Sequence, residues 1–396
     1  MRSKPIHPFP ARMAPEIALG VCVKLAADAT VLDPMAGSGT VLRAAAEQGL
    51  RGIGFDMDPL AVLLSKVWTT PIEVSNLEEA AADLVQRAQK LNVEDAPLPW
   101  IDEHEETLSF VKFWFGKKQR DDLRRLCFLL QDEDDSISNI LRVAISRLII
   151  TKERGASLAA DVSHSRPHRV YMEKGHDYDV FKSFIKSVKY IVKRLKPERL
   201  KGNVTVMYGD ARQLNIEDES VDAIITSPPY LNAIDYLRGH RLALVWLGYQ
   251  IDLLRLVRSR SMGAERKPDP EADLELAKEL TASIDPKGKL KDRRRQMINR
   301  YALDIHAFMQ EAYRVLKHGG EATLVVGNST HRGVYVENTT IVTTAAEHVG
   351  FEWLRDRTHK RPIPPSRRYL PPPSKDDESA LKRRMREEMV LTLRKN

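Results

Sequence analysis

The segment Thr226-Ser-Pro-Pro-Tyr230 carries the clearest chemical pattern in the sequence, and it ends an apolar run that predicts a buried strand. In open α/β sheets, ligands bind at the carboxyl ends of such strands. Pro228 and Pro229 stiffen the backbone and offer carbonyls without N–H groups. A rigid carbonyl and the Ser227 hydroxyl can both accept hydrogen bonds from an –NH₂ group, and Tyr230 offers a flat face for a base to stack on. The segment therefore indicates chemistry at the exocyclic amine of a nucleic-acid base.

A second segment, Asp33-Pro-Met-Ala-Gly-Ser-Gly-Thr40, joins a predicted strand to a predicted helix. Gly37 and Gly39 allow positive φ angles and let a ligand lie against bare backbone. The start of the following helix offers unpaired N–H groups to a carboxylate or a phosphate. Asp56 ends the next predicted strand, where an acid can accept both hydrogen bonds of a ribose diol. Together these features favour a nucleoside-containing cofactor over a tight structural turn.

Several other chemistries fit the sequence poorly. Leu42 stands where a nicotinamide-binding G-x-G-x-x-G turn needs its third glycine, and no Gly-Lys-Ser/Thr follows the turn as a P-loop requires. The two cysteines, Cys22 and Cys127, cannot form a disulfide framework or supply a zinc site by themselves. His164 and His168 have Pro167 between them, which breaks any helix that would align them. We therefore expect no metal site.

Both segments resemble motifs of the S-adenosylmethionine-dependent DNA amino-methyltransferases, which act on cytosine N4 or adenine N6. The resemblance covers the sheet-forming parts, about half of the chain. It implies that the first motif cradles the methionine part of S-adenosyl-L-methionine, that Asp56 binds the ribose and that Asp210 faces the adenine. The segment around Phe9 resembles the part of the family that closes over the cofactor. The implied cofactor-binding residues are Phe9, Asp33, Pro34, Gly37, Ser38, Gly39, Thr40, Asp56, Asp210 and Ala211.

The Ser-Pro-Pro-Tyr segment is similar to the catalytic motif of the same family. Members with serine in the first position are more often cytosine-N4 enzymes, and those with aspartate more often adenine-N6 enzymes. Cytosine N4 is therefore favoured, with adenine N6 left open. A cytosine-C5 enzyme is unsupported, because it needs a nucleophilic cysteine after a proline and neither cysteine follows one. The implied catalytic residues are Ser227, Pro228, Pro229 and Tyr230.

The two sites together can carry a methyl transfer without a metal or a covalent intermediate. The lone pair of a base amine is delocalised into the ring, so the nitrogen is a poor nucleophile. Acceptors for its two protons favour a pyramidal nitrogen, whose lone pair can attack an already activated sulfonium methyl. Positioning and electrostatics can then supply most of the rate. Because the target atom is hidden in a duplex, the base must be flipped out or met single-stranded.

The elements that position these residues alternate between strand and helix, which predicts a parallel sheet with helices on both faces. The expected fold is α/β, with a Rossmann-like, seven-stranded, mostly parallel methyltransferase sheet and a helical insertion. Residues 1–72 form the first part of the catalytic domain and 73–201 a mainly helical insertion, a candidate for target recognition. Residues 202–396 complete the catalytic domain, with a basic insertion at about 242–300. The predicted strands are 29–33, 51–56, 203–208, 221–226, 321–327, 351–357 and 388–393, and an extended loop is expected at 361–373.

Three basic segments could bind a polyanion, as the net charge of +7 also suggests. They run over residues 152–169, 255–267 and 361–369, and each could equally be a solvated loop. His240 and Arg241, shortly after the base motif, are expected to reach the phosphate backbone. The nucleic-acid-binding residues named from these segments are Arg166, Arg169, Arg258, Arg260, Arg367 and Arg368.

The expected partner is duplex DNA with a flipped base, and the alternative is RNA methylated at a base amine by the same chemistry. A third class, a binding module that has lost its chemistry, conflicts with the intact motifs. A cognate restriction endonuclease is a candidate partner, and the oligomeric state is open. The start of the chain holds prolines and charges where a signal peptide needs an apolar run. With no long apolar run either, we expect a cytoplasmic protein with no membrane span.

Overall fold

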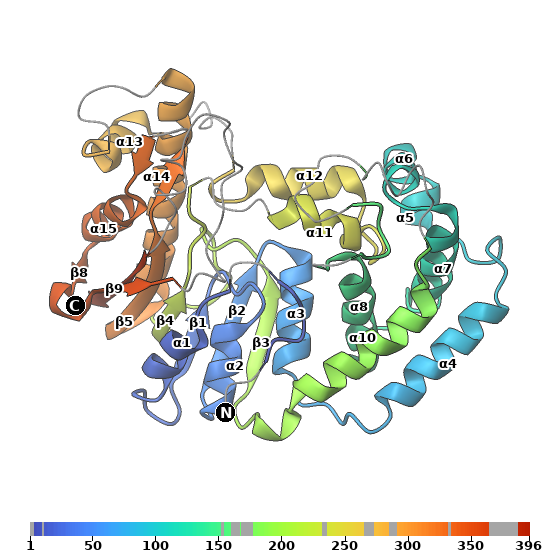
Figure 1. Cartoon of the computed structure of the whole chain (residues 1–396). Helices are drawn as coiled ribbons and strands as arrows, with labels where there is room; N and C mark the ends of the chain where they lie inside the picture. Colours follow the sequence, from blue (N-terminus) through green and yellow to red (C-terminus); the bar gives the residue numbers. More distant parts are fainter. Residues whose placement is uncertain are drawn as a thin grey trace.

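The computed structural model describes residues 4–9, 12–151, 154–159, 167, 177–231, 236–264, 273–284, 291–331, 334–363 and 387–396. One part of the molecule is built around an eight-stranded sheet (Figure 1). Its strands are β1 (Thr30–Asp33), β2 (Arg51–Asp56), β3 (Val204–Tyr208), β4 (Val221–Thr226), β5 (Leu316–Gly327), β8 (Phe351–Trp353), β9 (His359–Pro362) and β10 (Glu387–Lys395). They lie in the order β3-β2-β1-β4-β5-β10-β8, and β9 pairs with β10 outside this path.

The five strands from β3 to β5 run parallel, and β10 runs antiparallel between β5 and β8. All four residues of β1 are buried and so are five of the six in β4, as expected for central strands covered on both faces. The predicted α/β fold with a Rossmann-like, mostly parallel sheet is therefore confirmed.

The predicted strand positions need three adjustments. The strand expected at 321–327 begins earlier, at Leu316. The strand expected at 351–357 ends at Trp353, because Arg355–Arg357 form a short 3-10 helix. The segment expected as an extended loop from Arg361 begins inside β9, whose pairing with β10 raises the number of strands from seven to eight. A separate hairpin, β6 (Ser329–His331) with β7 (Val334–Val336), follows β5.

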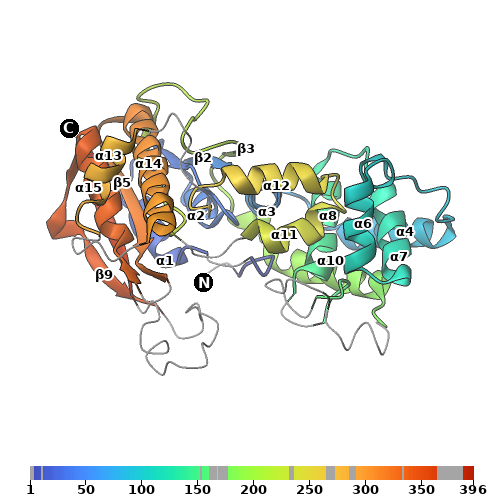
Figure 2. The same cartoon turned by 90° about the horizontal axis from the view of Figure 1, so that it is seen from above.

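Helices cover both faces of the sheet (Figures 1 and 2). On one face, α1 (Pro15–Cys22) and α2 (Thr40–Glu47) pack Ala18, Cys22 and Val41 against Val31 of β1. On the other face, a larger cluster joins Leu32 of β1 to the last helices. Those helices are α13 (Leu274–Thr281), α14 (Asp292–Val315) and α15 (Asn338–Val349).

Residues 77–195 contain only helices among their described elements: α4 (Leu77–Lys90), α5 (Pro99–Asp102), α6 (Glu105–Trp114), α7 (Lys117–Phe128), α8 (Ser136–Ile149) and α10 (Val180–Leu195). These helices pack on α3 (Pro59–Thr69) through one apolar cluster that includes Leu64 and Trp68. The same cluster takes in Leu242 of α11 (Tyr236–Leu244) and Leu254 of α12 (Ile251–Arg260). The helices that follow the base motif are therefore built into the same body as the helices that follow the cofactor motif.

No helix within the described residues is long and apolar enough to cross a membrane.

The chain returns from the helical region to the sheet at Gly202, in a passage with no space for a side chain. The N–H groups of Lys201 and Gly202 both donate to the carbonyl of Ala46, each at 2.9 Å. A Cβ at position 202 would lie 2.0 Å from the carbonyl oxygen of Leu50. The backbone itself would have to move to accept any other residue.

We expect Gly202→Ala to lower the free energy of unfolding by about 1–3 kcal/mol, the usual cost of overpacking. The matched control is Gly20→Ala in α1, where a Cβ would meet nothing within 4 Å. That control should be neutral or stabilising by up to about 1 kcal/mol, because alanine favours helix. Urea unfolding of both variants measures the difference, and equal stabilities would contradict the packing described here.

Candidate active site

The two predicted motifs leave the sheet at the same edge, from neighbouring strands. β1 and β4 pair in parallel, with Leu32 opposite Ile224. The turn after β1 contains Gly37 and Gly39, and the turn after β4 contains the Ser-Pro-Pro-Tyr segment. Adjacent strands lie about 4.8 Å apart. The geometry therefore places the expected cofactor turn next to the expected base turn.

A buried hydrogen bond joins the two strand ends. The Thr226 hydroxyl donates to Oδ1 of Asp33 at 2.7 Å, and the N–H of Met35 donates to the same oxygen at 3.3 Å. Thr226 is 0% exposed and Asp33 is 3% exposed. Burial raises the pKa of Asp33 to about 7, although both hydrogen bonds act to lower it.

The glycine turn is packed between Ser65 and Phe9. Gly37 and Gly39 have φ angles of 53° and 82°, which side chains rarely adopt. A Cβ on Gly39 would lie 3.0 Å from the Cα of Ser65, whose hydroxyl donates to the Gly37 carbonyl. Phe9 lies on the other side, with its ring 3.5 Å from the position of a Cβ on Gly37. The turn therefore requires glycine at both positions.

Asp56, the expected ribose acid, holds the glycine turn. Its two oxygens accept hydrogen bonds from the N–H groups of Gly37 and Asp58, each at 2.8 Å. Burial and the nearby Asp58 carboxylate raise the pKa of Asp56 to about 7. Each carboxylate oxygen can accept more than one hydrogen bond, so acceptor capacity remains for two hydroxyls.

Asp58 and His240 form a buried pair that sequence analysis did not find. Asp58 caps α3 by accepting from the N–H of Leu60, and its second oxygen contacts Nδ1 of His240. His240 is 1% exposed and stacks at 4.9 Å from the Phe9 ring. The prediction that His240 reaches a phosphate backbone is therefore wrong, since its ring is buried against Asp58 and Phe9.

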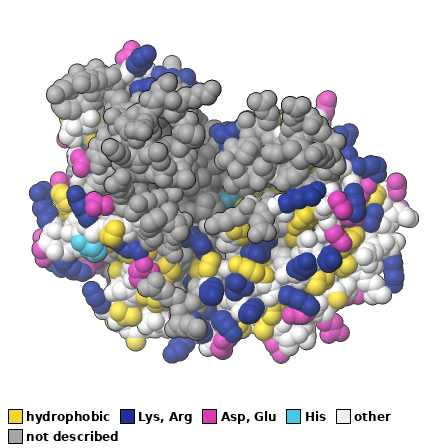
Figure 3. Space-filling view, viewed as in Figure 1, with side chains coloured by type: hydrophobic (Ala, Val, Ile, Leu, Met, Phe, Trp, Pro, Cys, Tyr) yellow, Lys and Arg dark blue, Asp and Glu magenta, His cyan; other side chains and the backbone are white. Residues whose placement is uncertain are grey.

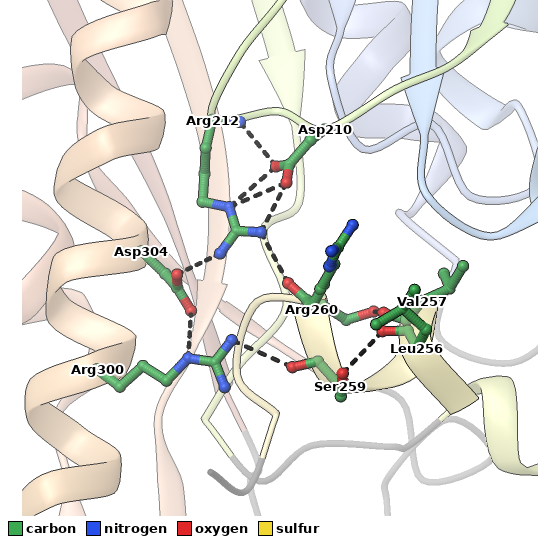
Figure 4. A network of polar contacts seen from close by, with 9 residues as sticks. Asp210, Arg212, Leu256, Val257, Ser259, Arg260, Arg300 and Asp304 are labelled. Atoms are coloured by element: carbon green, nitrogen blue, oxygen red, sulfur yellow. Dashed lines mark hydrogen bonds and ion pairs between the residues drawn. The ribbon is translucent and has the colours of Figure 1, made fainter. Parts of the chain in front are cut away.

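Asp210, the acid expected to face the adenine, is ion-paired with Arg212 (Figure 4). The Arg212 side chain contacts both carboxylate oxygens, with Nη2 to Oδ2 at 2.6 Å and Nε to Oδ1 at 3.0 Å. Its own N–H adds a third bond to Oδ1 at 3.0 Å. Asp210 follows β3, the neighbour of β2, and Ala211 beside it is buried. The arginine was not singled out from the sequence.

Ser227 of the base motif is hydrogen-bonded to β5, the next strand of the sheet. The Ser227 hydroxyl donates to the carbonyl of Val325 in β5 at 3.1 Å. Burial raises the pKa of Tyr230 to about 12, against a hydrogen bond with Ser227 that acts to lower it. The serine oxygen itself keeps lone pairs that can accept a hydrogen bond.

The predicted nucleic-acid contacts are only partly within the described residues. Arg258 and Arg260 lie on α12 and are exposed, whereas Arg166, Arg169, Arg367 and Arg368 lie outside those residues. Within them, no group of three or more His, Cys, Asp or Glu side chains could hold a metal ion.

A basic stripe that the sequence analysis missed runs along α10. Its exposed lysines recur at a helical spacing, which puts them on one face of the helix. Lys and Arg side chains also gather on the lower half of the face seen in Figure 3, where Figure 1 shows α10. The helical period of the lysines could have revealed this stripe. Its members are Lys182, Lys186, Lys189 and Lys193.

Comparison with known proteins finds Type II methyltransferases that resemble this chain. The Type II methyltransferase M.BsoBI of Geobacillus stearothermophilus is 23% identical over 84% of this chain and 75% of its own. M.AvaI of Anabaena variabilis is 23% identical over 81% and 73%, and M.MvaI of Kocuria varians 24% identical over 62% and 58%. The chain is thus similar, over most of its length, to Type II DNA methyltransferases.

No family model matches the chain. Among solved structures, a TehB-like methyltransferase of Corynebacterium glutamicum covers 97% of this chain and 89% of its own, at 10% identity and a TM-score of 0.31. That structural similarity is distant. The fold is assigned from the strand order of the sheet itself.

The cofactor is S-adenosyl-L-methionine, and the residues present fit it. A Cβ on Gly39 would lie too close to Ser65, and Gly39 caps the start of α2. The Ser38 hydroxyl beside it is buried without a hydrogen-bond partner in the described structure. A bound carboxylate or amine can satisfy such a group, which otherwise costs about 1–3 kcal/mol.

Removal of the Thr226 hydroxyl should cost more stability at high pH than at low pH. The pKa of Asp33 is about 7 in the folded protein and about 3.9 in an unfolded chain. The folded protein thus holds more protons in this window, and its stability falls as the pH rises through it. Thr226→Val takes away a bond that lowers the folded pKa, so it deepens this loss.

We expect Thr226→Val to cost about 1–3 kcal/mol above pH 8, as for an acceptor left unpaired, and clearly less near pH 5. Thr226→Ser is the matched control, because it keeps the donor. Chemical unfolding across this pH range gives the comparison. A cost that is the same at both pH values would show that the hydroxyl does not act through the Asp33 charge.

Proposed function

We propose that this methyltransferase transfers a methyl group to the exocyclic amine of a base flipped out of duplex DNA, with cytosine N4 favoured over adenine N6. The observation that carries the proposal is the joint between the two motifs. The Thr226–Asp33 hydrogen bond, 2.7 Å long, fixes the base turn beside the cofactor turn. Type II methyltransferases that resemble most of the chain support DNA as the substrate.

The base turn supplies acceptors for both protons of the amine. Ser227 offers a lone pair of its hydroxyl oxygen, while its own proton is donated to Val325. The turn also offers the carbonyl of Pro228. The ring of Pro229, which has no N–H group, makes the backbone at this carbonyl rigid. Two acceptors favour a pyramidal nitrogen whose lone pair points toward the cofactor turn. Attack by the amine would form the nitrogen–carbon bond as the carbon–sulfur bond breaks, would leave S-adenosylhomocysteine, and would release one amine proton to solvent.

Tyr230 gives the flipped base a surface to stack on. Its phenol is fixed by Ser227, so the ring is held next to the acceptors. Stacking on an aromatic ring contributes about 1–3 kcal/mol per base and tolerates either base. The preference for cytosine N4 accordingly rests on Ser227 in the first position of the motif, where the resembling family more often has serine in cytosine-N4 enzymes.

The cofactor-binding roles follow from the turn geometry. Bound there, S-adenosyl-L-methionine supplies a methyl group already activated by a sulfonium charge. The Gly37–Gly39 turn, Ser38 and the start of α2 at Thr40 would hold the methionine part, with Asp33 and Pro34 fixing the turn. Asp56 would bind the ribose, and Phe9 closes the site from the amino-terminal side. Asp210 and Ala211 lie one strand further along, where the adenine would sit.

DNA would be bound across the carboxyl edge of the sheet. α12 lies above this edge in Figure 1 and exposes Arg258 and Arg260, which are placed to contact phosphates. The helical region of residues 77–195 shares its core with α11 and α12, so it can support a target-reading surface on the same side. Arg166, Arg169, Arg367 and Arg368 remain candidates for further contacts, and a cognate restriction endonuclease remains a candidate partner.

A substrate panel tests the proposed reaction. Duplex DNA, single-stranded DNA and RNA are each incubated with the chain and cofactor labelled in its methyl group. Label in DNA, at alkali-stable base positions, is the expected result. Label in RNA alone would replace the proposal with RNA base-amine methylation.

Tyr230→Ala should remove stacking while leaving cofactor binding intact. We expect kcat/KM to fall by about 5- to 150-fold, which corresponds to stacking of about 1–3 kcal/mol. Tyr230→Phe is the control, because it keeps the ring and loses only the hydroxyl. Cofactor affinity by calorimetry should be unchanged in both variants. Full activity of Tyr230→Ala would refute the stacking role.

Arg258→Ala and Arg260→Ala should weaken DNA binding through lost phosphate contacts. For each, the slope of log affinity against log salt should become shallower by about 1, with little change between DNA sequences. Arg255→Ala is the matched control on the same helix, since Arg255 is paired with Glu106. Slopes that are the same in all three variants and the unsubstituted chain would rule out α12 as a DNA-binding helix.

A further inference from the structure

The carboxyl end of α12 is bound by two arginines that belong to other elements (Figure 4). Nη2 of Arg212 donates to the carbonyl of Arg260 at 2.7 Å, and Nη2 of Arg300 donates to the carbonyl of Ser259 at 3.3 Å. Carbonyls in the last turn of a helix have no partner within the helix and carry its negative dipole end. Cationic donors at this position therefore stabilise the end of α12 at one place relative to the sheet.

Asp304 of α14 lies between the two arginines. One of its oxygens contacts Nη1 of Arg212, and the other lies 3.7 Å from Nε of Arg300. The side chains of Arg300, Asp304 and Arg212 are 8%, 10% and 19% exposed. Removing one partner from such a largely buried ionic group leaves an uncompensated charge, which is strongly unfavourable.

Arg212 connects this network to the expected adenine position. Its guanidinium binds the Asp210 carboxylate on one side and the Arg260 carbonyl on the other. Three N–H groups of Arg212 bind Asp210, and the Nε–H is shared between both carboxylate oxygens at 3.0 and 3.2 Å, so about one of the four lone-pair positions is left for a ligand amine. A ligand that takes this position fixes Asp210, and through Arg212 it also fixes the end of α12.

We infer that Arg212 is a positioning residue that couples cofactor binding to DNA binding by α12. The inference rests on the proposed function, in which Asp210 faces the cofactor and Arg258 and Arg260 contact phosphates. A phosphate bound by these two side chains acts on the last turn of α12, which is the main-chain segment that Arg212 binds. Linkage then requires each ligand to raise the affinity for the other by the same factor.

The test measures affinities without turnover, using the full chain, S-adenosylhomocysteine and sheared genomic DNA. For the unsubstituted chain, we expect DNA to tighten S-adenosylhomocysteine binding by about tenfold, within the usual range for coupled sites. Arg212→Met should weaken S-adenosylhomocysteine binding in the absence of DNA by about tenfold, because Asp210 loses its orientation. In that variant, DNA should no longer change the affinity. Arg212→Lys, which keeps the charge, should restore part of the coupling.

Arg314→Met is the matched control. Arg314 also lies at the junction of α14 with the segment after β3, where it donates to Glu311, Asp218 and the carbonyls of Leu214 and Ile216. Its loss should lower the melting temperature as much as the loss of Arg212, while the coupling persists. Equal loss of coupling in both variants would mean that Arg212 has a structural role only. Unchanged coupling in Arg212→Met, or none in the unsubstituted chain, would also overturn the inference.

Failure of the proposed function is recognised separately. If the substrate panel labels RNA alone, the same affinities are measured with that RNA. The coupling between S-adenosylhomocysteine binding and RNA binding then decides the inference. Binding of S-adenosylhomocysteine in the absence of any nucleic acid tests the Asp210–Arg212 part independently. Unchanged binding by Arg212→Met in that experiment would refute it whatever the substrate.

Discussion

The hydrogen bond from Thr226 to Asp33 is the contact on which the arrangement of the site depends. It joins the last residues of two parallel strands, β1 and β4, inside the sheet, where both side chains are shielded from water. A carboxyl group in such a place needs partners, because an unpaired buried acceptor is costly. Thr226 is therefore at once the end of the base-motif strand and the partner of the first cofactor-motif residue. The two motifs cannot separate without breaking this bond.

Other acids at the carboxyl edge of the sheet also have hydrogen-bond partners. Three acids, Asp33, Asp56 and Asp58, lie close together, and each has a defined partner: a hydroxyl, two backbone N–H groups or His240. The pKa values of Asp33 and Asp56 are nevertheless raised to about 7, mainly by burial. A cationic ligand near them would favour their charged forms. The site is therefore electrostatically suited to a cofactor with a positive centre.

Sequence reasoning located the sheet and both motifs because these features are local. The apolar run of β4, the glycines at 37 and 39 and the Ser-Pro-Pro-Tyr segment each carry their signal within a few residues. The contacts of Arg212 with Asp304 and of His240 with Asp58 join residues 92 and 182 positions apart, and no local pattern indicates them. For the same reason His240 was mistaken for a phosphate contact. β9 was missed because its pairing depends on β10, and a strand of basic residues looks like a solvated loop.

Nucleosides from the DNA of a host that expresses the chain, analysed by mass spectrometry, give the most direct test of the paired turns. N4-methylcytosine, present only with the intact chain, is the predicted product. N6-methyladenine would keep the geometry and correct the base. DNA with neither modification, from a host in which the folded chain binds its cofactor, would contradict the claim that these two turns bring a methyl donor to a base amine.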